Sequence, residues 1–429
     1  MTSFKCYKIL ALTTLCLVWA APGYAPERYW QMWKIDTLGN GADGVHTGDI
    51  NRDGLADVVS GWEQSGDLML YFNPGPETVR DELAWSQVDI SGGVPIKGVE
   101  DAAFADLDLD GVDDAVISSI EGTSQSLGIH WLEGENLGNP DDWRGVNLVP
   151  EEAAGYMKAR AAQIDGVAGA DIVAGSKAMG DKPAGIYWFK APEGVHPDNI
   201  HQWQRFYVGP VDYKTVTLEL RDMDGDASLD IIVSGRNGIH WFKNPGPEAL
   251  VKAPAEAVWE RITITEKGSE FTFCDHVIDG MDDIIVTTSR HTGTVAKWLK
   301  RLDASGRQWE EYPITSDRLR AGNAYVRKFV LKGVKCGYVD GDNIIDLVFT
   351  GSGDGYGVFM MSPRTTIASG MVWNLTFLTP YANRIKFDNL NLVDIDGDGD
   401  LDVVTTEEGE GIFTSGKGVL WLENPLFPR

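Results

Sequence analysis

The chain is short of cysteine and of apolar runs that could cross a membrane. Four cysteines occur in 429 residues, and Cys6 and Cys16 lie close to the N-terminus. Cys274 and Cys336 alone cannot form a disulfide framework for a chain of this size. These two cysteines occupy similar places in adjacent repeats. The sequence is compatible with one disulfide bridge between them and also with two buried thiols. Beyond the N-terminal segment no apolar run approaches membrane length, so we expect no membrane span.

Basic side chains are also scarce. Lys and Arg number 37 against 64 Asp and Glu, which gives a formal net charge of −27. This excess of negative charge excludes nucleic-acid binding by bulk electrostatics. The 43% hydrophobic composition indicates a folded chain, and 49 glycines with 15 tryptophans and few helix-forming runs favour an all-β repeat protein.

Residues 1–25 have the pattern of an export signal. Lys5 and Lys8 supply positive charge, Ile9–Val18 is a short apolar run, and Val18-Trp19-Ala20 is an acceptable cleavage site. We expect cleavage near residues 20–25. The mature chain, residues 26–429, is then a single domain that is secreted or periplasmic, and we expect it to be a monomer.

An acidic loop recurs along the chain. Its fullest copy, Asp394–Asp402, reads D-I-D-G-D-G-D-L-D, and Gly399 permits a sharp turn. Hard oxygen ligands in such a compact loop suit calcium, although a single copy could equally be an acidic turn that binds nothing. Further copies, complete or degenerate, give seven in all, and their final aspartates are 57, 57, 59, 53, 63 and 56 residues apart. A β-branched stretch follows each copy and predicts a strand.

Each repeat predicts four strands. An inner strand precedes the acidic loop, and a β-branched strand, a G-x-x-W strand such as 238–243 and a Trp-led strand such as 259–264 follow it. Four strands in each repeat correspond to one blade of a β-propeller. The last repeat lacks its fourth strand, while Trp30, Trp33 and Ile35 carry that pattern near the N-terminus. We therefore predict an all-β, seven-bladed β-propeller of four-stranded blades, closed by the N-terminal strand, rather than an open solenoid.

The acidic loops followed by β-branched strands resemble FG-GAP/VCBS repeats, which build the calcium-binding propeller of integrin alpha subunits. The resemblance covers nearly all of the mature chain and is more specific for fold than for function. It implies several structural Ca²⁺ sites. Their implied ligands are Asp49, Asn51, Asp53 and Asp57; Asp106, Asp108, Asp110 and Asp114; Asp222, Asp224, Asp226 and Asp230; and Asp394, Asp396, Asp398 and Asp402. Ala227 stands where glycine is usual and predicts a strained turn.

In that family, ligand sites usually form on the face opposite the calcium loops. Basic and aromatic side chains of this chain fall at the corresponding positions, and we interpret them as a cationic central funnel. Some of these bases could instead pair with Asp43, Glu100, Asp101, Glu219 and Glu270, which fall in the same zone. The candidates for substrate binding are Trp62, Lys97, Lys158, Lys177, Arg290, His291 and Lys386. Trp62 could stack on a sugar or simply pack in the core.

The chain is also similar to secreted propeller-type uronate polysaccharide lyases, in size and in being a lone exported propeller. That likeness implies β-elimination on an acidic polysaccharide or oligosaccharide, which needs a base and a cation that neutralises the carboxylate. The candidates are His46 as base, Arg160 and Arg236 as neutralisers, and Lys214 and Tyr213 as further acid–base groups. The alternative is a non-catalytic carbohydrate- or protein-binding propeller, in which His46 is structural.

Overall fold

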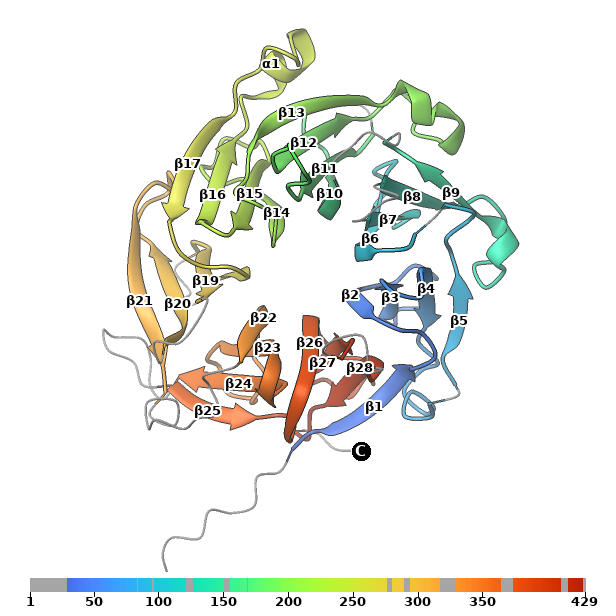
Figure 1. Ribbon diagram of the computed structural model, residues 1–429, viewed down its shortest axis with the longest axis vertical. Helices are drawn as coiled ribbons and strands as arrows, with labels where there is room; N and C mark the ends of the chain where they lie inside the picture. The colour runs from blue at the N-terminus through green and yellow to red at the C-terminus, as the bar shows by residue number, and fades with distance from the viewer. Residues whose placement is uncertain are drawn as a thin grey trace, which may run out of the picture.

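The computed structural model describes residues 29–426, apart from 83, 95, 121–125, 150–154, 168, 276–279, 289–293, 317–328, 364–372 and 410–415. The export segment expected at residues 1–25 therefore lies outside the described residues. Nearly all of the regular structure is β-strand, and the strands form antiparallel sheets arranged around a central axis (Figure 1). Among the described helices, none is long and apolar enough to cross a membrane.

The sheets of the first half of the chain each contain four consecutive strands. The first sheet consists of β2 (Ala42–Gly48), β3 (Asp57–Trp62), β4 (Asp67–Phe72) and β5 (Ser86–Asp89). The second consists of β6 (Val99–Ala105), β7 (Ala115–Ile120), β8 (Ser126–Leu132) and β9 (Trp143–Asn147). The third consists of β10 (Tyr156–Ala162), β11 (Asp171–Ser176), β12 (Gly185–Lys190) and β13 (Gln204–Pro210). The fourth consists of β14 (Leu218–Arg221), β15 (Asp230–Gly235), β16 (Gly238–Lys243) and β17 (Glu260–Thr265).

The second half repeats the pattern with one departure. The fifth sheet consists of β18 (Phe271–Cys274), β19 (Asp283–Thr287), β20 (Thr294–Arg301) and β21 (Trp309–Thr315). The sixth set consists of β22 (Val330–Gly337), β23 (Asp346–Tyr356), β24 (Val358–Pro363) and β25 (Trp373–Phe377). The last set contains β26 (Tyr381–Val393), β27 (Asp402–Glu407), β28 (Gly418–Glu423) and β1 (Gln31–Asp36). These last two sets form one eight-stranded sheet, because the long strands β23 and β26 also pair, an arrangement that the repeat pattern does not predict.

The N-terminal strand pairs with the last one, as the missing strand of the seventh repeat predicts. β1 runs antiparallel to β28, with Trp33 opposite Trp421. The four-strand repeat is thereby confirmed in each of the seven sets. Short helical segments lie between third and fourth strands, namely α1 (Pro247–Lys252), η1 (Pro140–Asp142) and η2 (Pro197–Gln202).

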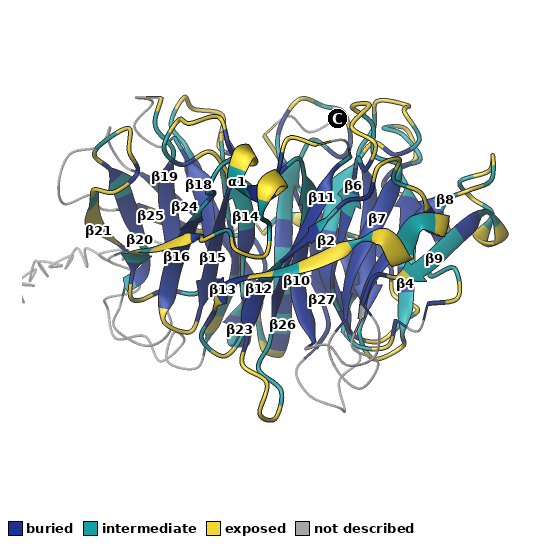
Figure 2. Ribbon diagram, turned by 90° about the horizontal axis from the view of Figure 1, so that it is seen from above, coloured by how far each residue is buried: buried dark blue, intermediate teal, exposed yellow. Residues whose placement is uncertain are grey.

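The core lies between neighbouring sheets. Trp188 of the third sheet packs in one buried cluster with Leu218, Ile231 and Phe242 of the fourth. Removing these apolar side chains from water stabilises the contact between sheets. The second strands are accordingly buried along their whole length, except for β23 beyond Gly351, whereas turns and outermost strands are more exposed (Figure 2).

The final aspartate of each acidic loop begins the second strand of its set, except that Asp114 directly precedes β7. Asp230 is fully buried, and its carboxylate accepts hydrogen bonds from the backbone N–H groups of Asn244 (2.7 Å) and Met223 (3.0 Å). The Asn244 side chain in turn donates to the carbonyl of Ile164 in the preceding sheet (3.1 Å). Equivalent bonds run from Asn73 to Ile395 and from Asn424 to Val339. Each such asparagine therefore ties two neighbouring sheets together, in addition to ending its strand.

One disulfide joins two adjacent inner strands. Cys274 at the end of β18 and Cys336 in β22 are bonded, with Cα atoms 6.4 Å apart. Of the two states that the sequence leaves open for these cysteines, the structure has the bridge.

Candidate functional site

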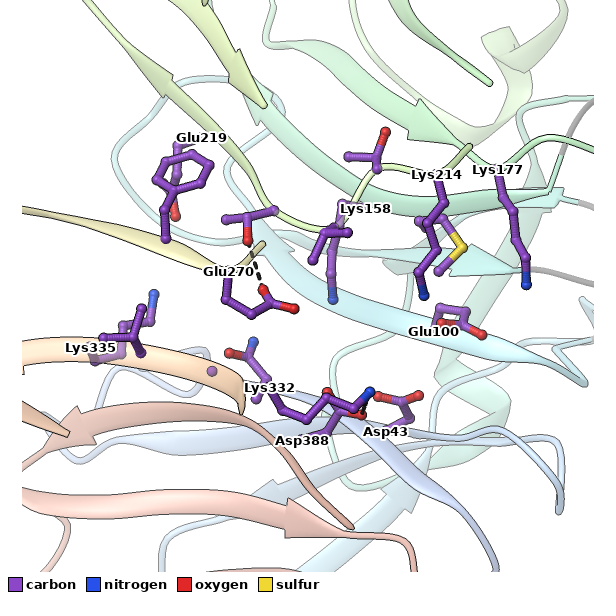
Figure 3. A pocket seen from close by; sticks show the side chains of 18 of the residues that line it. Asp43, Glu100, Lys158, Lys177, Lys214, Glu219, Glu270, Lys332, Lys335 and Asp388 are labelled. Atoms are coloured by element: carbon purple, nitrogen blue, oxygen red, sulfur yellow. Dashed lines mark hydrogen bonds and ion pairs between the residues drawn. The ribbon is translucent and has the colours of Figure 1, made fainter. Parts of the chain in front are cut away.

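A central cavity is enclosed by the inner strands. Its volume is about 280 Å³, and its wall takes side chains from the inner strand of each of the seven sets or from the residues just before it (Figure 3). Some inner strands contribute neighbouring residues to the wall, such as Met157 with Lys158 and Asp388 with Asn389. The charged residues of the wall are Asp43, Glu63, Glu100, Lys158, Arg160, Lys177, Lys214, Glu219, Glu270, Lys332, Lys335, Lys386 and Asp388.

Asp101 in β6 is the centre of one ionic network. Its side chain is 1% exposed and accepts from Arg160 Nη1 (2.8 Å), with Lys158 Nζ at 3.3 Å and His46 Nε2 at 3.2 Å. Burial would raise the pKa of Asp101, but the charges of Lys158 and Arg160 and the hydrogen bond with His46 hold it well below its usual range. A buried carboxylate among three such partners stays ionised.

Asp388 in β26 is the centre of a second network. It lies 3.3 Å from Lys332 Nζ and 3.9 Å from Lys386 Nζ. Burial opposes ionisation of Asp388, while Lys332 and Lys386 lower its pKa. Across the cavity, Glu270 accepts from the Thr217 hydroxyl (2.7 Å), and burial raises the pKa of Glu270 to about 7 against the charge of Lys158.

His46 lies beside the first network, in β2. Its side chain is 19% exposed, and its Nε2 faces Asp101 and lies 3.4 Å from Arg160 Nη2. Burial lowers the pKa of His46, the charge of Arg160 lowers it further, and Asp101 opposes both. With Nε2–H donated to Asp101, the neutral ring keeps its lone pair on Nδ1, where it can accept a proton.

The structure brings together only part of the predicted site. The predicted residues that line the cavity are Lys158, Arg160, Lys177, Lys214 and Lys386; His46 is not among the lining residues but contacts Arg160. Lys97 is exposed and is not among the lining residues. Arg290 and His291 lie outside the described residues.

Three aromatic or basic candidates are placed elsewhere. Trp62 is 2% exposed and donates from Nε1 to the Tyr71 hydroxyl (2.9 Å), so it is a core residue and not a platform for a sugar. Arg236 is exposed, stacks on Tyr213 at 4.6 Å and lines a separate cavity of about 390 Å³. Neither Tyr213 nor Arg236 is among the residues that line the central cavity.

The cavity wall is not predominantly cationic, contrary to the expectation of a cationic funnel. Seven basic residues and six acidic residues line it. The bases do gather on this face as predicted, but several pair with acids because charges brought out of water need partners. Lys332 and Asp388 were not among the predicted site residues. Asp388 falls two residues after Lys386, a spacing that places both on the same face of a strand.

Three acidic loops bring carboxylates within ligand distance of one point. The ligand atoms lie within 4.8 Å of one another in Asp106, Asp108 and Asp110, in Asp222, Asp224 and Asp230, and in Asp394, Asp396 and Asp402. In two of these loops a basic side chain reaches the carboxylates. Lys243 contacts Asp224 and lies 2.7 Å from Asp226, and Arg80 contacts Asp396. Asp398 Oδ2 is buried and has no hydrogen-bond partner among the described residues.

The backbone of these loops has the left-handed turn that their sequence predicts. Gly54, Gly111 and Gly399 have φ between 84° and 100°. Ala227, at the equivalent place in the fourth repeat, has φ 67°. This region favours glycine, so the strain expected at Ala227 is present.

Comparisons with known proteins were made for the whole chain. No protein-family model matches it, and no curated protein matches it. A solved lectin from Agrocybe aegerita, which recognises non-reducing terminal N-acetylglucosamine, is similar with a TM-score of 0.43 and 13% identity over 90% of this chain and 95% of that one. The Dos1 propeller has a TM-score of 0.47 and 8% identity over 92% and 95%. BBS1N, solved in complex with ARL6DN, has a TM-score of 0.48 and 10% identity over 94% of this chain and 97% of that one. Likeness at this level carries no information on ligand or activity.

The Asp101 network gives a direct test of what holds the inner strands. We predict that Asp101→Asn lowers the free energy of unfolding by about 3 kcal/mol, because Arg160 and Lys158 lose the counter-charge that offsets their burial. Glu82→Gln is the control. Glu82 pairs with Lys34 at 3.5 Å on the surface, where both are about half exposed, and its loss should cost under about 1 kcal/mol. Urea unfolding at fixed calcium concentration measures the free energy of unfolding of both variants. Equal losses of stability in the two variants would contradict the role given to Asp101.

Proposed function

We propose that the protein is an exported propeller that acts on an acidic carbohydrate in the central cavity by β-elimination of the polysaccharide-lyase type. The observation that carries this proposal is the contact of the neutral His46 with both Asp101 and Arg160 at the cavity wall. A base beside a guanidinium is the pair that elimination next to a carboxylate requires.

The roles follow from the contacts. Arg160 neutralises the uronate carboxylate, because its planar fork matches that group. Asp101 accepts Nε2–H of His46 and so orients the ring. His46 Nδ1 removes the proton next to the carboxylate, and the electron pair left behind forms the double bond as the glycosidic oxygen leaves. Lys214 and Lys335 line the same cavity and are the groups available to protonate the leaving oxygen.

The alternative is a binding propeller without catalysis. It is favoured by the pairing of Arg160, Lys158 and Lys386 with acidic side chains, which a purely structural network would also show. The two functions differ in their products, because binding alone leaves the glycan intact.

Incubation with a panel of uronate-containing and sulfated polysaccharides distinguishes them. We expect a rise in the ultraviolet absorbance of the new C4–C5 double bond, and a loss of about 100-fold or more in turnover for His46→Gln, with binding retained. His196→Gln is the control, since His196 is 56% exposed on the outer side. Retention of a polymer in an affinity gel without any absorbance change would favour the binding propeller. Full turnover by His46→Gln would contradict the assignment of the base.

We also propose structural calcium in the acidic loops. Loop 106–114 suits it best, because no ion pair to a base is recorded for its carboxylates in the described structure, whereas Lys243 competes at 222–230 and Arg80 at 394–402. The loop at 49–57 offers Asp49, Asn51, Asp53 and Asp57 as oxygen ligands. A bound ion would offset the repulsion among these carboxylates.

A chelator should therefore lower the melting temperature. A site filled at about 100 times its dissociation constant adds about 2.7 kcal/mol to the stability of the folded state. Asp108→Asn should melt lower than the wild type in calcium and respond less to the chelator. Melting curves that coincide with and without chelator would refute structural calcium.

Closure and export complete the proposal. Pairing of β1 with β28 would close seven blades into one ring, which leaves no free sheet edge between the first and last sets. The disulfide between Cys274 and Cys336 supports an oxidising compartment outside the cytosol.

A further inference from the structure

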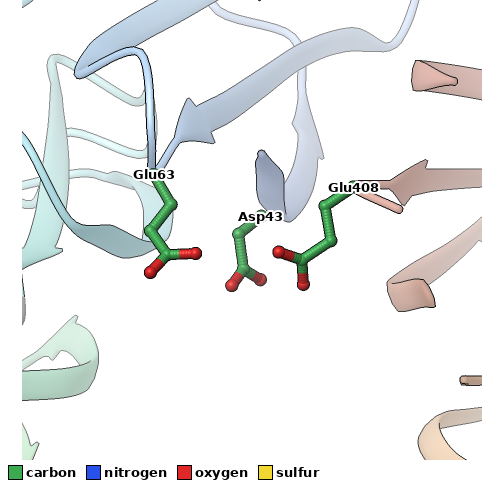
Figure 4. A group of neighbouring side chains, drawn as sticks. All are labelled: Asp43, Glu63 and Glu408. Atoms are coloured by element: carbon green, nitrogen blue, oxygen red, sulfur yellow. The ribbon is translucent and has the colours of Figure 1, made fainter. Parts of the chain in front are cut away.

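Three carboxylates that belong to none of the acidic loops meet at the mouth of the central cavity. Ligand oxygens of Asp43, Glu63 and Glu408 lie within 4.8 Å of one another, and their side chains converge on one open space (Figure 4). Asp43 lies in β2, Glu63 directly follows β3, and Glu408 directly follows β27. Because the acidic loops precede β3 and β27, this group lies at the opposite ends of those strands.

Asp43 has no partner that would explain its burial. Its side chain is 7% exposed, and the described part of the chain gives it neither a hydrogen bond nor an ion pair. A buried carboxylate in this state is costly. Burial raises the pKa of Asp43 well above its usual range, and the charges of Asp388 and Glu100 raise it further.

The neighbouring bases do not balance the group. Glu408, which is 5% exposed, contacts Lys386, and Lys386 is shared with Asp388 at 3.9 Å. Glu63 accepts a hydrogen bond from the amide of its neighbour Gln64 (3.1 Å). Among the described residues, the ion pair from Lys386 to Glu408 is the one that reaches these three carboxylates, and Lys158 lowers the pKa of Asp43 without forming an ion pair with it.

We propose that Asp43, Glu63 and Glu408 bind one hard divalent cation, such as Ca²⁺, at the mouth of the central cavity. Carboxylate oxygens on separate elements, with solvent on one side, provide part of the six to eight oxygen ligands that calcium takes, and water supplies the rest. The site is independent of the acidic loops and of the reaction proposed above. Its ligands come from the first and last sheets, whose inner strands β2 and β26 lie side by side.

The number of calcium ions bound by the whole chain tests this site. Equilibrium dialysis with Ca²⁺ alone should show one ion per chain fewer in Asp43→Asn than in the wild type, whatever number the loops hold. Glu63→Gln should lose the same ion, and the double variant should lose no second one, since both residues serve a single site. Glu77→Gln is the control, because Glu77 is an exposed acid near the same sheet.

Melting curves separate a metal site from a structural carboxylate. In chelator, Asp43→Asn should melt at or above the wild-type temperature because it removes an unpartnered buried carboxyl. On addition of calcium, the melting temperature of the wild type should rise by more than that of Asp43→Asn. Unchanged stoichiometry in both single variants would overturn the proposal. So would an Asp43→Asn variant that is destabilised equally with and without calcium. Calcium binding here with no glycan product would leave this site standing and the elimination proposal refuted.

Discussion

The structure depends on an aspartate at the start of the second strand of each set, or directly before it in the second set, and six of these seven aspartates are buried. Among these residues, Asp57, Asp230, Asp283 and Asp346 are completely buried. Carboxylates in such positions are tolerated only when backbone N–H groups satisfy them. An N–H at the end of the third strand, or directly after it, does so in five sets, through Asn73, Ala191, Asn244, Arg301 and Asn424. One side chain therefore fixes the loop, the second strand and the end of the third strand relative to one another.

The same device sets the spacing between sheets. The second residue of a loop, such as Ile164, Met223 or Ile395, is buried, and its carbonyl accepts a hydrogen bond from the next sheet. In the fifth set Arg301 takes the part that asparagine has elsewhere. Sheets held at this spacing bring their inner strands around one axis. The cavity, with its ionic networks at Asp101 and Asp388, is a consequence of that arrangement.

The sequence alone predicts the strands and turns within each repeat. The loops, the G-x-x-W strands and the displaced strand with Trp33 predicted every four-strand set, because period and turn chemistry act within one repeat. Contacts between repeats were harder to predict. The sequence left open whether Trp62 stacks on a sugar or packs in the core, and it packs against Tyr71; Arg236 stacks on Tyr213 and does not line the central cavity. Glu63 and Glu408 meet only because the first and last sheets are neighbours, which no local pattern encodes. Lys332 and Asp388 likewise pair only because the inner strands β22 and β26 of two successive sets are neighbours.

Hydrogen exchange is the measurement that tests this account most directly. The amides of Asn73, Asn244 and Asn424 donate to buried aspartates, so they should exchange only through global unfolding, at a common and very slow rate. The outer amide of Asn199, which bonds to His196 within an exposed 3₁₀ turn, should exchange much faster. If the three buried amides exchanged as quickly as Asn199, or at rates unrelated to global stability, the aspartates would not be the constraint on which the arrangement of the sheets depends.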